Sequence, residues 1–404
     1  MPIRSIFLKN GFAALASGFL LLAASTARLP GQAAPTLQDL KPTRPNDSLR
    51  REAQHSIDTA LAWLKKEQAP AGSWSNAEYP ALTALVHTAF LRDPARGGRP
   101  LDESDTDESL RRAHAFLAGC AQPDGGIYRK GLGNYNTSIS MVALLAENVP
   151  GNDDLLRRAR GYVLGGQRHL PEGDPNDGGF GYDAKGDPHC DMSNSAYALE
   201  ALALTRDLQT TAATELRKDP DLDWKAAASF LGRLQNLPGS NTQSWASDDA
   251  QNKGGFVYTP DKSTAGEVKL PDGRRALRSY GSASYAGLLS FIYADVKKDD
   301  PRVLAAHEWL RTNYTLEENP GMGKAGLYYY YELMAKALTA HGTEEMPLAD
   351  GRKVRWREEL AVKLMSLQNK DGFWQNENGR WWEKDPVLAT AYSVLALEFM
   401  YPKM

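Results

Sequence analysis

The sequence predicts an all-α protein of six helix pairs, in which an outer ring of helices surrounds an inner ring. The first observation is a pattern that recurs six times after residue 48: an amphipathic segment, a Gly-rich turn with an aromatic residue, and an apolar segment. The second is the contrast between the segments, since one has a single apolar stripe and the other is apolar nearly all round. The third is composition: 42% hydrophobic and 24% charged residues among 404 are typical of a globular chain.

The first four copies of the pattern carry an aromatic–aliphatic pair, a glutamine about five residues later and a glycine before the next aromatic residue, and the last two carry part of it. In chain order the copies are Trp63-Leu64 with Gln68, Phe116-Leu117 with Gln122, Tyr162-Val163 with Gln167, Phe230-Leu231 with Gln235, Trp309-Leu310 with Tyr314, and Leu364 with Gln368. The fifth copy is degenerate because tyrosine stands where glutamine is expected. The six copies account for the chain from residue 49 to the end.

The first segment of each pair is expected to be partly exposed to solvent, and the second is expected to be buried. In the first segment of the second copy, Leu110, Ala113 and Leu117 form one stripe, while Arg111 and Arg112 lie on a solvated face. The apolar second segments must be covered on most sides, so we expect them inside. Their predicted starts are Tyr79, Tyr135, Asp191, Tyr280, Gly326 and Asp385, the last followed by proline at the first helical position.

The N-terminus has the pattern of a secretory signal. Arg4 and Lys9 precede an uncharged, Ala- and Leu-rich stretch over residues 11–26. An uncleaved membrane anchor is the alternative, but the apolar run falls short of about 20 residues. We therefore expect an exported protein, periplasmic or secreted, without a membrane span in the mature chain. The expected organisation is a signal peptide over 1–33, a Pro-rich linker over 34–48 and the repeat domain over 49–404.

Charge, cysteine content and histidine spacing indicate which partners, disulfides and cofactors to expect. A net charge of −3 argues against a nucleic-acid-binding surface. Only Cys120 and Cys190 occur, and we expect two buried thiols rather than a disulfide, although export would permit one. The seven histidines show no metal-binding spacing, and we expect no cofactor.

The repeat resembles that of squalene–hopene cyclases, oxidosqualene cyclases and protein prenyltransferase β subunits, that is, the terpenoid cyclase and protein prenyltransferase superfamily. The shared skeleton is Ala-x-x-aromatic-Leu-x-x-x-Gln, then Gly-x-Trp, and it covers residues 50–404. The segments at 326–338 and 384–398 are similar to exported bacterial members. The resemblance implies an (α/α)6 toroid whose inner helices frame a central apolar cavity.

The chemistry of those relatives is not fully encoded here. The cyclase acid motif is Asp-x-Asp-Asp, and the nearest strings, 105–108 and 221–224, lack the final Asp and precede predicted outer helices. The prenyltransferase zinc ligands have no counterparts near 326–328 and 385–388. His189, Cys190 and Asp191 have ligand chemistry, but three adjacent residues cannot readily converge on one ion. We therefore predict no metal site.

Candidate site residues lie at inner-helix starts, because all inner helices point the same way and their first turns converge on one rim. The candidate catalytic acids are Asp191, Glu332 and Asp385, although Asp191 and Asp385 also suit helix caps. The candidate cavity-lining residues are Tyr328, Tyr329, Tyr330, Tyr331, His87, Tyr197 and Tyr285. Aromatic faces at a cavity stabilise cations, but tyrosines also serve as packing between helices.

Three functions stay open at this point. The first is an enzyme that acts on an isoprenoid or another apolar ligand, as the resemblance implies. The second is a binding or scaffold protein that kept the toroid without catalysis. The third is a carbohydrate-active toroid, which needs two opposed carboxylates about 5–10 Å apart. A dry aromatic cavity favours the first, a plugged cavity the second and an open groove with paired acids the third.

Overall fold

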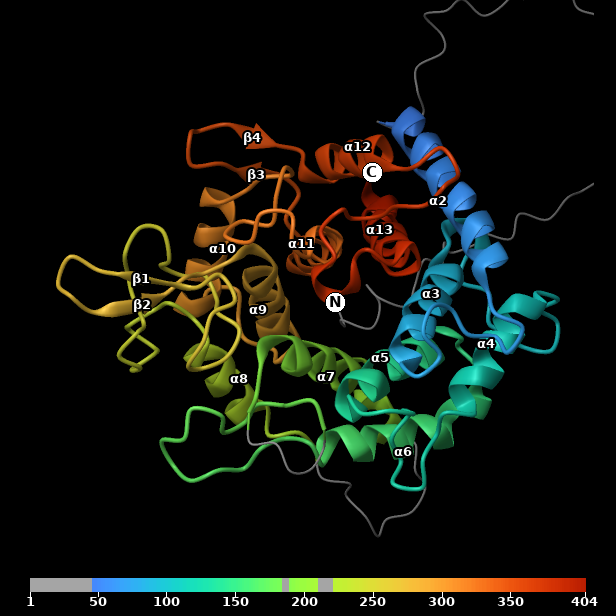
Figure 1. Ribbon diagram of the computed structural model, residues 1–404, viewed down its shortest axis with the longest axis horizontal. Helices are drawn as coiled ribbons and strands as arrows, with labels where there is room; N and C mark the ends of the chain where they lie inside the picture. The colour runs from blue at the N-terminus through green and yellow to red at the C-terminus, as the bar shows by residue number, and fades with distance from the viewer. Residues whose placement is uncertain (1–45, 184–188, 210–220) are drawn as a thin grey trace, which may run out of the picture.

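The computed structural model describes residues 46–183, 189–209 and 221–404, and within them twelve α-helices form two concentric rings (Figure 1). The outer helices are α2 (Asp47–Glu67), α4 (Glu108–Ala118), α6 (Asp153–Leu164), α8 (Trp224–Arg233), α10 (Pro301–Thr312) and α12 (Trp356–Leu367). The inner helices are α3 (Pro80–Arg92), α5 (Gly133–Ala146), α7 (Met192–Leu204), α9 (Gly281–Tyr293), α11 (Leu327–His341) and α13 (Pro386–Met400). This arrangement confirms the predicted all-α toroid of six helix pairs.

The inner ring is continuous. Each inner helix contacts the next, and α13 contacts α3 to close the circle. In α3 every side chain from Pro80 to Leu91 is buried, as expected of a helix covered on all sides. Five inner helices begin at the residue after the predicted start, whereas α5 begins at Gly133, two residues before the predicted Tyr135. Leu132, which precedes α5 with φ 51°, gave no sequence signal for that start.

The turn glycines hold neighbouring repeats together. Gly178 has φ +84°, and a Cβ there would lie less than 3 Å from the backbone carbonyl of Ala226 in the next outer helix. The same clash would arise between Gly72 and Arg112, Gly125 and Arg158, Gly254 and Ala305, and Gly372 and Thr59. Only glycine permits both the left-handed backbone and this close approach. The recurring glycine therefore sets the spacing of the outer ring.

In four repeats the recurring glutamine also links neighbouring repeats by hydrogen bonds, whereas Gln122 donates to carbonyls of its own turn. In those four repeats the glutamine Nε2 donates to a backbone carbonyl at the start of, or within, the next outer helix: Gln68 to Ser109 (2.9 Å), Gln167 to Asp223 (2.9 Å), Gln235 to Arg302 (2.8 Å) and Gln368 to Ser56 (2.9 Å). A hydroxyl in the first turns of the inner helix then accepts from the turn's backbone N–H, as Thr83 does from Trp74 at 3.0 Å. The same contact positions α3, α5, α7, α9 and α13 against their own turns.

Two short antiparallel hairpins lie outside the helical rings. Strands β1 (Glu267–Lys269) and β2 (Arg275–Leu277) pair between α8 and α9, and β3 (Met346–Pro347) pairs with β4 (Lys353–Val354) between α11 and α12. Both Cys120 and Cys190 are buried, and no disulfide joins them. Among the described helices none is long and apolar enough to cross a membrane. The predicted signal peptide and residues 34–45 of the predicted linker lie outside the described residues.

Candidate functional site

A cavity of about 430 Å³ lies where the N-terminal ends of the inner helices converge. Residues at the start of all six inner helices contribute to it, which follows from their common direction in the ring. Among the described residues that line the cavity, many are aromatic: Tyr79, Tyr135, Tyr182, Tyr258, Tyr280, Tyr329, Trp381, Trp382 and Tyr392. Small and aliphatic residues such as Ala283 and Leu388 complete it. This cavity, hereafter the mouth cavity, is the candidate site.

One wall of the mouth cavity is a chain of hydroxyls that leads to a buried carboxylate. The Tyr182 and Tyr258 hydroxyls are 2.9 Å apart, and the Ser193 Oγ lies 3.3 Å from the Tyr258 hydroxyl. Ser193 then donates to Asp191 Oδ1 at 2.8 Å. Tyr182, Ser193 and Tyr258 line the cavity, whereas Asp191 lies behind them with 3% of its surface exposed.

Asp191 is at once a helix cap and part of this wall. Its Oδ1 accepts from the Asn194 backbone N–H at 2.9 Å and its Oδ2 from Asn194 Nδ2 at 2.8 Å. Burial raises the pKa of Asp191, and the bonds from Asn194 and Ser193 offset part of that rise. Asp191 therefore holds α7 in place and brings a carboxyl group next to the cavity.

A second carboxylate, Glu383, lines the opposite part of the ring, between α11 and α13. It is 1% exposed, and it accepts from the Tyr329 backbone N–H at 2.8 Å and from Asn376 Nδ2 at 2.6 Å. Burial raises the pKa of Glu383 against the effect of those bonds. Glu383 was not among the predicted site residues, because it lies in a turn and its role as the anchor of α11 depends on a contact across 54 residues.

Two adjacent tryptophans lie at the mouth beside Glu383. Trp381 and Trp382 have φ 54° and 65°, a conformation that costs non-glycine residues about 1–2 kcal/mol each. They are 45% and 48% exposed, and the Trp382 ring meets the Tyr79 ring edge-on at 5.0 Å. Strained, exposed aromatic residues at a cavity rim indicate a contact surface for a ligand. In the sequence, two adjacent tryptophans shortly before the Asp385 cap were the signal that could have indicated this part of the rim.

The floor of the mouth cavity is a cluster of four tyrosines from α5, α7, α11 and α13. The ring centroids of Tyr135 and Tyr197 are 4.9 Å apart, those of Tyr197 and Tyr329 6.4 Å, and those of Tyr329 and Tyr392 5.5 Å. Burial raises the pKa of Tyr135 to about 12, so its hydroxyl stays neutral at physiological pH. This tyrosine floor separates the cavity from the rest of the ring axis.

Beneath the floor lies a buried ion cluster. Lys336 Nζ contacts Glu332 Oε1 at 2.8 Å and Glu200 Oε2 at 3.1 Å. A space of about 30 Å³, roughly the volume of one water molecule, adjoins Glu200, Lys336 and Tyr197 there. Burial raises the pKa of Glu332 while Lys336 opposes that rise. Glu332, predicted as a candidate catalytic acid at the rim, thus lies below the floor and does not line the mouth cavity.

The other predicted residues fall into two groups. Of the four consecutive tyrosines, Tyr329 lines the cavity, and Tyr197 belongs to its floor. The other three hydroxyls donate to carbonyls away from it: Tyr328 to Gln375 at 3.4 Å, Tyr330 to Thr315 at 2.9 Å and Tyr331 to Leu316 at 2.5 Å. Tyr285 is buried against Tyr330, with ring centroids 5.6 Å apart. One helical turn cannot direct four side chains to one side, which explains the split.

Asp385 and His87 also lie elsewhere. The Asp385 side chain accepts from the Val387 backbone N–H at 2.9 Å as the cap of α13, and it hydrogen-bonds Ser75. His87 is fully buried, with Nε2 2.7 Å from Glu147 Oε1. His114 Nδ1 lies 2.9 Å from the other oxygen of Glu147. Neither Asp385 nor His87 lines the mouth cavity.

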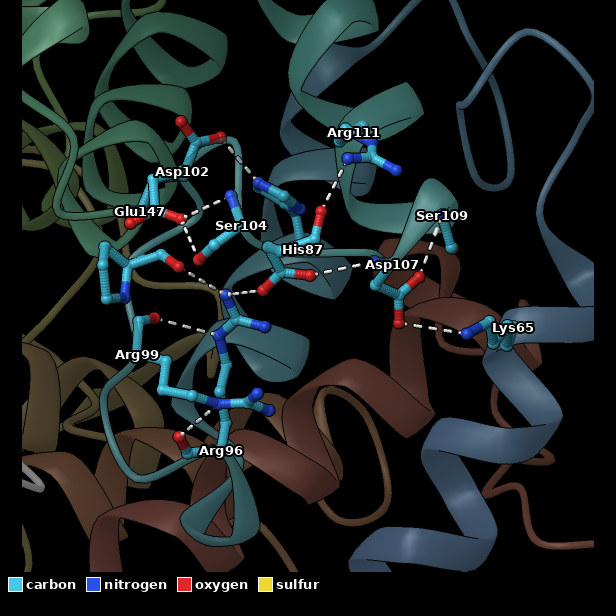
Figure 2. A network of polar contacts seen from close by, with 12 residues as sticks. Lys65, His87, Arg96, Arg99, Asp102, Ser104, Asp107, Ser109, Arg111 and Glu147 are labelled. Atoms are coloured by element: carbon cyan, nitrogen blue, oxygen red, sulfur yellow. Dashed lines mark hydrogen bonds and ion pairs between the residues drawn. The ribbon is translucent and has the colours of Figure 1, made fainter.

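The string at 105–108, close to the cyclase acid motif, belongs to a structural network around the start of α4 (Figure 2). Asp107 caps the helix by accepting from the Ser109 backbone N–H at 2.9 Å. Asp105 pairs with the buried Arg96 at 2.5 Å. In the string at 221–224, Asp223 caps α8 in the same way. Both strings thus precede and cap outer helices, as predicted. Within the described residues, no group of three or more His, Cys, Asp and Glu side chains is arranged to hold a metal ion.

Solved structures with the same architecture exist. No protein-family model matches the chain, and no curated protein matches it in sequence. The type II terpene cyclase MstE from Scytonema superposes with a TM-score of 0.53 at 13% identity, over 88% of this chain and 99% of that one. The GH76 α-mannanase BT2949 from Bacteroides thetaiotaomicron superposes with a TM-score of 0.50 at 11% identity, over 86% and 94%. The chain therefore has the α/α toroid fold found in terpenoid cyclases, as its repeat predicted.

Proposed function

We propose that the chain binds an apolar small molecule of isoprenoid size in the mouth cavity. The observation that carries the proposal is the aromatic wall: nine tyrosine and tryptophan side chains are among the described residues that surround about 430 Å³. Small-molecule sites typically enclose roughly 300–1,000 Å³ with an apolar lining and a few polar groups. A terpene cyclase with the same fold supports the isoprenoid class. The proposal concerns binding, because the strings nearest to the cyclase acid motif lie at the starts of outer helices.

The α-mannanase with this fold raises a glycoside as the competing ligand. Glycoside hydrolysis uses two carboxyl groups about 5–10 Å apart, on either side of the scissile bond. Glu383 is the one carboxylate among the described lining residues, and it anchors α11 through the Tyr329 backbone N–H and also accepts from Asn376. The residues that line the cavity therefore favour an apolar ligand over a glycoside.

Tryptophan fluorescence tests the proposal, since Trp381 and Trp382 lie at the rim. Titration with farnesol should change the emission saturably. Trp382→Ala should weaken binding several-fold, since an aromatic contact contributes about 0.5–1.5 kcal/mol. Trp224→Ala, at the start of outer helix α8, should leave the affinity unchanged. Absence of saturable binding to the unaltered protein would contradict the proposal.

We also propose that the chain is exported, on the basis of Arg4 and Lys9 before the apolar stretch at 11–26. These residues lie outside the described part of the chain. N-terminal sequencing of the protein from its native host should find a start near residue 34. A start at the initiating methionine in the cytoplasmic fraction would contradict it.

A further inference from the structure

We propose that the mouth cavity selects ligands with a cationic head, that is, an apolar chain that ends in a protonated or quaternary amine, over ligands with a carboxylate or phosphate head. The inference rests on the proposed function and adds the charge of the ligand to it. Three features of the described cavity lead to it: π faces in the wall, carboxyl groups in and behind the wall, and the lack of basic side chains among the lining residues.

Aromatic rings that line the cavity are inclined to one another. Tyr79 and Trp382 pack edge-to-face at 5.0 Å, and Tyr329 tilts against Tyr392 at 5.5 Å, so the rings meet at different angles. A ring face carries partial negative charge and attracts a cation within about 6 Å of its centroid, an attraction that grows when water is excluded. Tertiary and quaternary ammonium groups are bound in proteins by such groups of inclined rings.

Two carboxyl groups add to the negative potential. Glu383 lines the cavity, and Asp191 lies behind the hydroxyls of Ser193 and Tyr258. Both are at least 97% buried in the protein, where Coulomb attraction is less screened than in water. A cation in the cavity stabilises the charged form of both groups, whereas an anion opposes it.

No lysine, arginine or histidine is among the described residues that line the cavity. Arg380 in the rim loop is exposed and stacks on the Trp381 ring at 4.6 Å, and its charge acts on the cavity-lining Tyr280 without Arg380 itself being among the lining residues. Lys336 lies beneath the tyrosine floor, where Glu200 and Glu332 already balance its charge. A carboxylate or phosphate that entered the cavity below the rim would lose its hydration without gaining a positive partner among the described lining residues, which is unfavourable.

The floor reinforces the same preference. Burial raises the pKa of Tyr197, Tyr329 and Tyr392 well above 10, and the charge of Glu332 contributes to each rise. Neutral tyrosine hydroxyls also present lone pairs to an N–H donor. The tyrosine floor and the lining residues therefore both favour a positively charged ligand over a negatively charged one.

Chain-matched ligands test the inference. Farnesylamine, farnesol, farnesoic acid and farnesyl diphosphate share one apolar chain and differ in the head group. By isothermal titration calorimetry with the full mature chain at pH 7, the amine should bind at least about tenfold more tightly than the acid or the diphosphate, a difference of 1.4 kcal/mol. Farnesol should fall between them. Equal or tighter binding of either anion would overturn the inference.

Matched variants test whether the carboxyl groups of Asp191 and Glu383 cause the preference for the amine. Asp191→Asn keeps a capping side chain of the same size and removes the charge, so the amine-to-acid affinity ratio should fall several-fold. Glu383→Gln should act in the same direction. Asp385→Asn makes the identical change at a cap outside the cavity and should leave the ratio unchanged. An unchanged ratio in both Asp191→Asn and Glu383→Gln, with unchanged melting temperatures, would overturn the inference.

The ligand series separates this inference from the proposed function. If farnesol binds but the amine binds no more tightly than the acid, this inference alone fails. If none of the four ligands binds, the proposed function fails as well.

Discussion

Gln368 and Ser56, 312 residues apart, form a reciprocal pair of hydrogen bonds. Gln368 Nε2 donates to the Ser56 carbonyl at 2.9 Å, and the Ser56 hydroxyl donates to Gln368 Oε1 at 2.7 Å. Gln68 makes the same pair with Ser109 at 2.9 and 2.8 Å. The last repeat therefore joins the first repeat as the first joins the second. The same glutamine–serine contact thus joins the first two outer helices and closes the outer ring between the last and the first.

Gln368→Ala should destabilise the closed ring. The change removes three hydrogen bonds, two with Ser56 and one to the Gly372 carbonyl, and leaves the Ser56 carbonyl partly unpaired, for a loss of about 1–3 kcal/mol of unfolding free energy. Urea denaturation followed by circular dichroism measures it. Gln251→Ala, at an exposed position, is the control and should be neutral. Equal stability of the two variants would show that this contact does not hold the ring closed.

Gly178→Ala should cost more than Gly173→Ala. Both glycines have positive φ, +84° and +91°, so both variants bear the same backbone strain. Only at residue 178 would the new Cβ meet the Ala226 carbonyl, whereas nothing lies within 4 Å at residue 173. We expect Gly178→Ala to lower the melting temperature clearly further. Similar losses would mean that the close approach of turn and helix does not matter.

The Glu147 cluster predicts a loss of stability in acid. Burial would raise the pKa of Glu147, but hydrogen bonds from His114 and His87 outweigh it and lower that pKa to about 2. Because the folded pKa lies below the ordinary value of 4.5, Glu147 stabilises the fold above pH 4.5, and this contribution disappears as the pH falls towards 2. Glu147→Gln should therefore be less stable than the unaltered protein at pH 7.

Urea titrations of both proteins across that pH window provide the check. The stability difference between them should shrink steadily from pH 4.5 downward. The bond to Glu147 also raises the pKa of His114, so that group contributes most below its unfolded value of 6.5 and the contribution fades as the pH rises through the folded pKa. A constant difference between the two proteins would contradict the account.

Lys336→Met should destabilise the protein strongly. The change leaves Glu200 and Glu332 buried without their shared cation, and removal of one partner from a buried ion pair typically costs about 3–5 kcal/mol. Lys336→Met combined with Glu332→Gln should recover part of the loss, because one buried charge is then gone. Chemical denaturation of the two variants compares them. No recovery in the double variant would argue against direct pairing.

Local signals made most of the fold predictable. Asp191 and Asp385 marked helix starts because caps are encoded within three residues. The site was less accessible to such reasoning. The rotation of α11 decides that Tyr329 faces the cavity and Tyr330 does not, and only packing fixes that rotation. Glu383 was missed because its partner, the start of α11, is distant in sequence.

The central claim is that the mouth cavity holds an apolar ligand. A crystal structure of the protein grown with farnesol tests it most directly. The account predicts ligand density inside the cavity, against Tyr329 and Tyr392 of the floor and Trp382 of the rim. Farnesol bound at another place, with only solvent between Trp382 and the tyrosine floor, would contradict it.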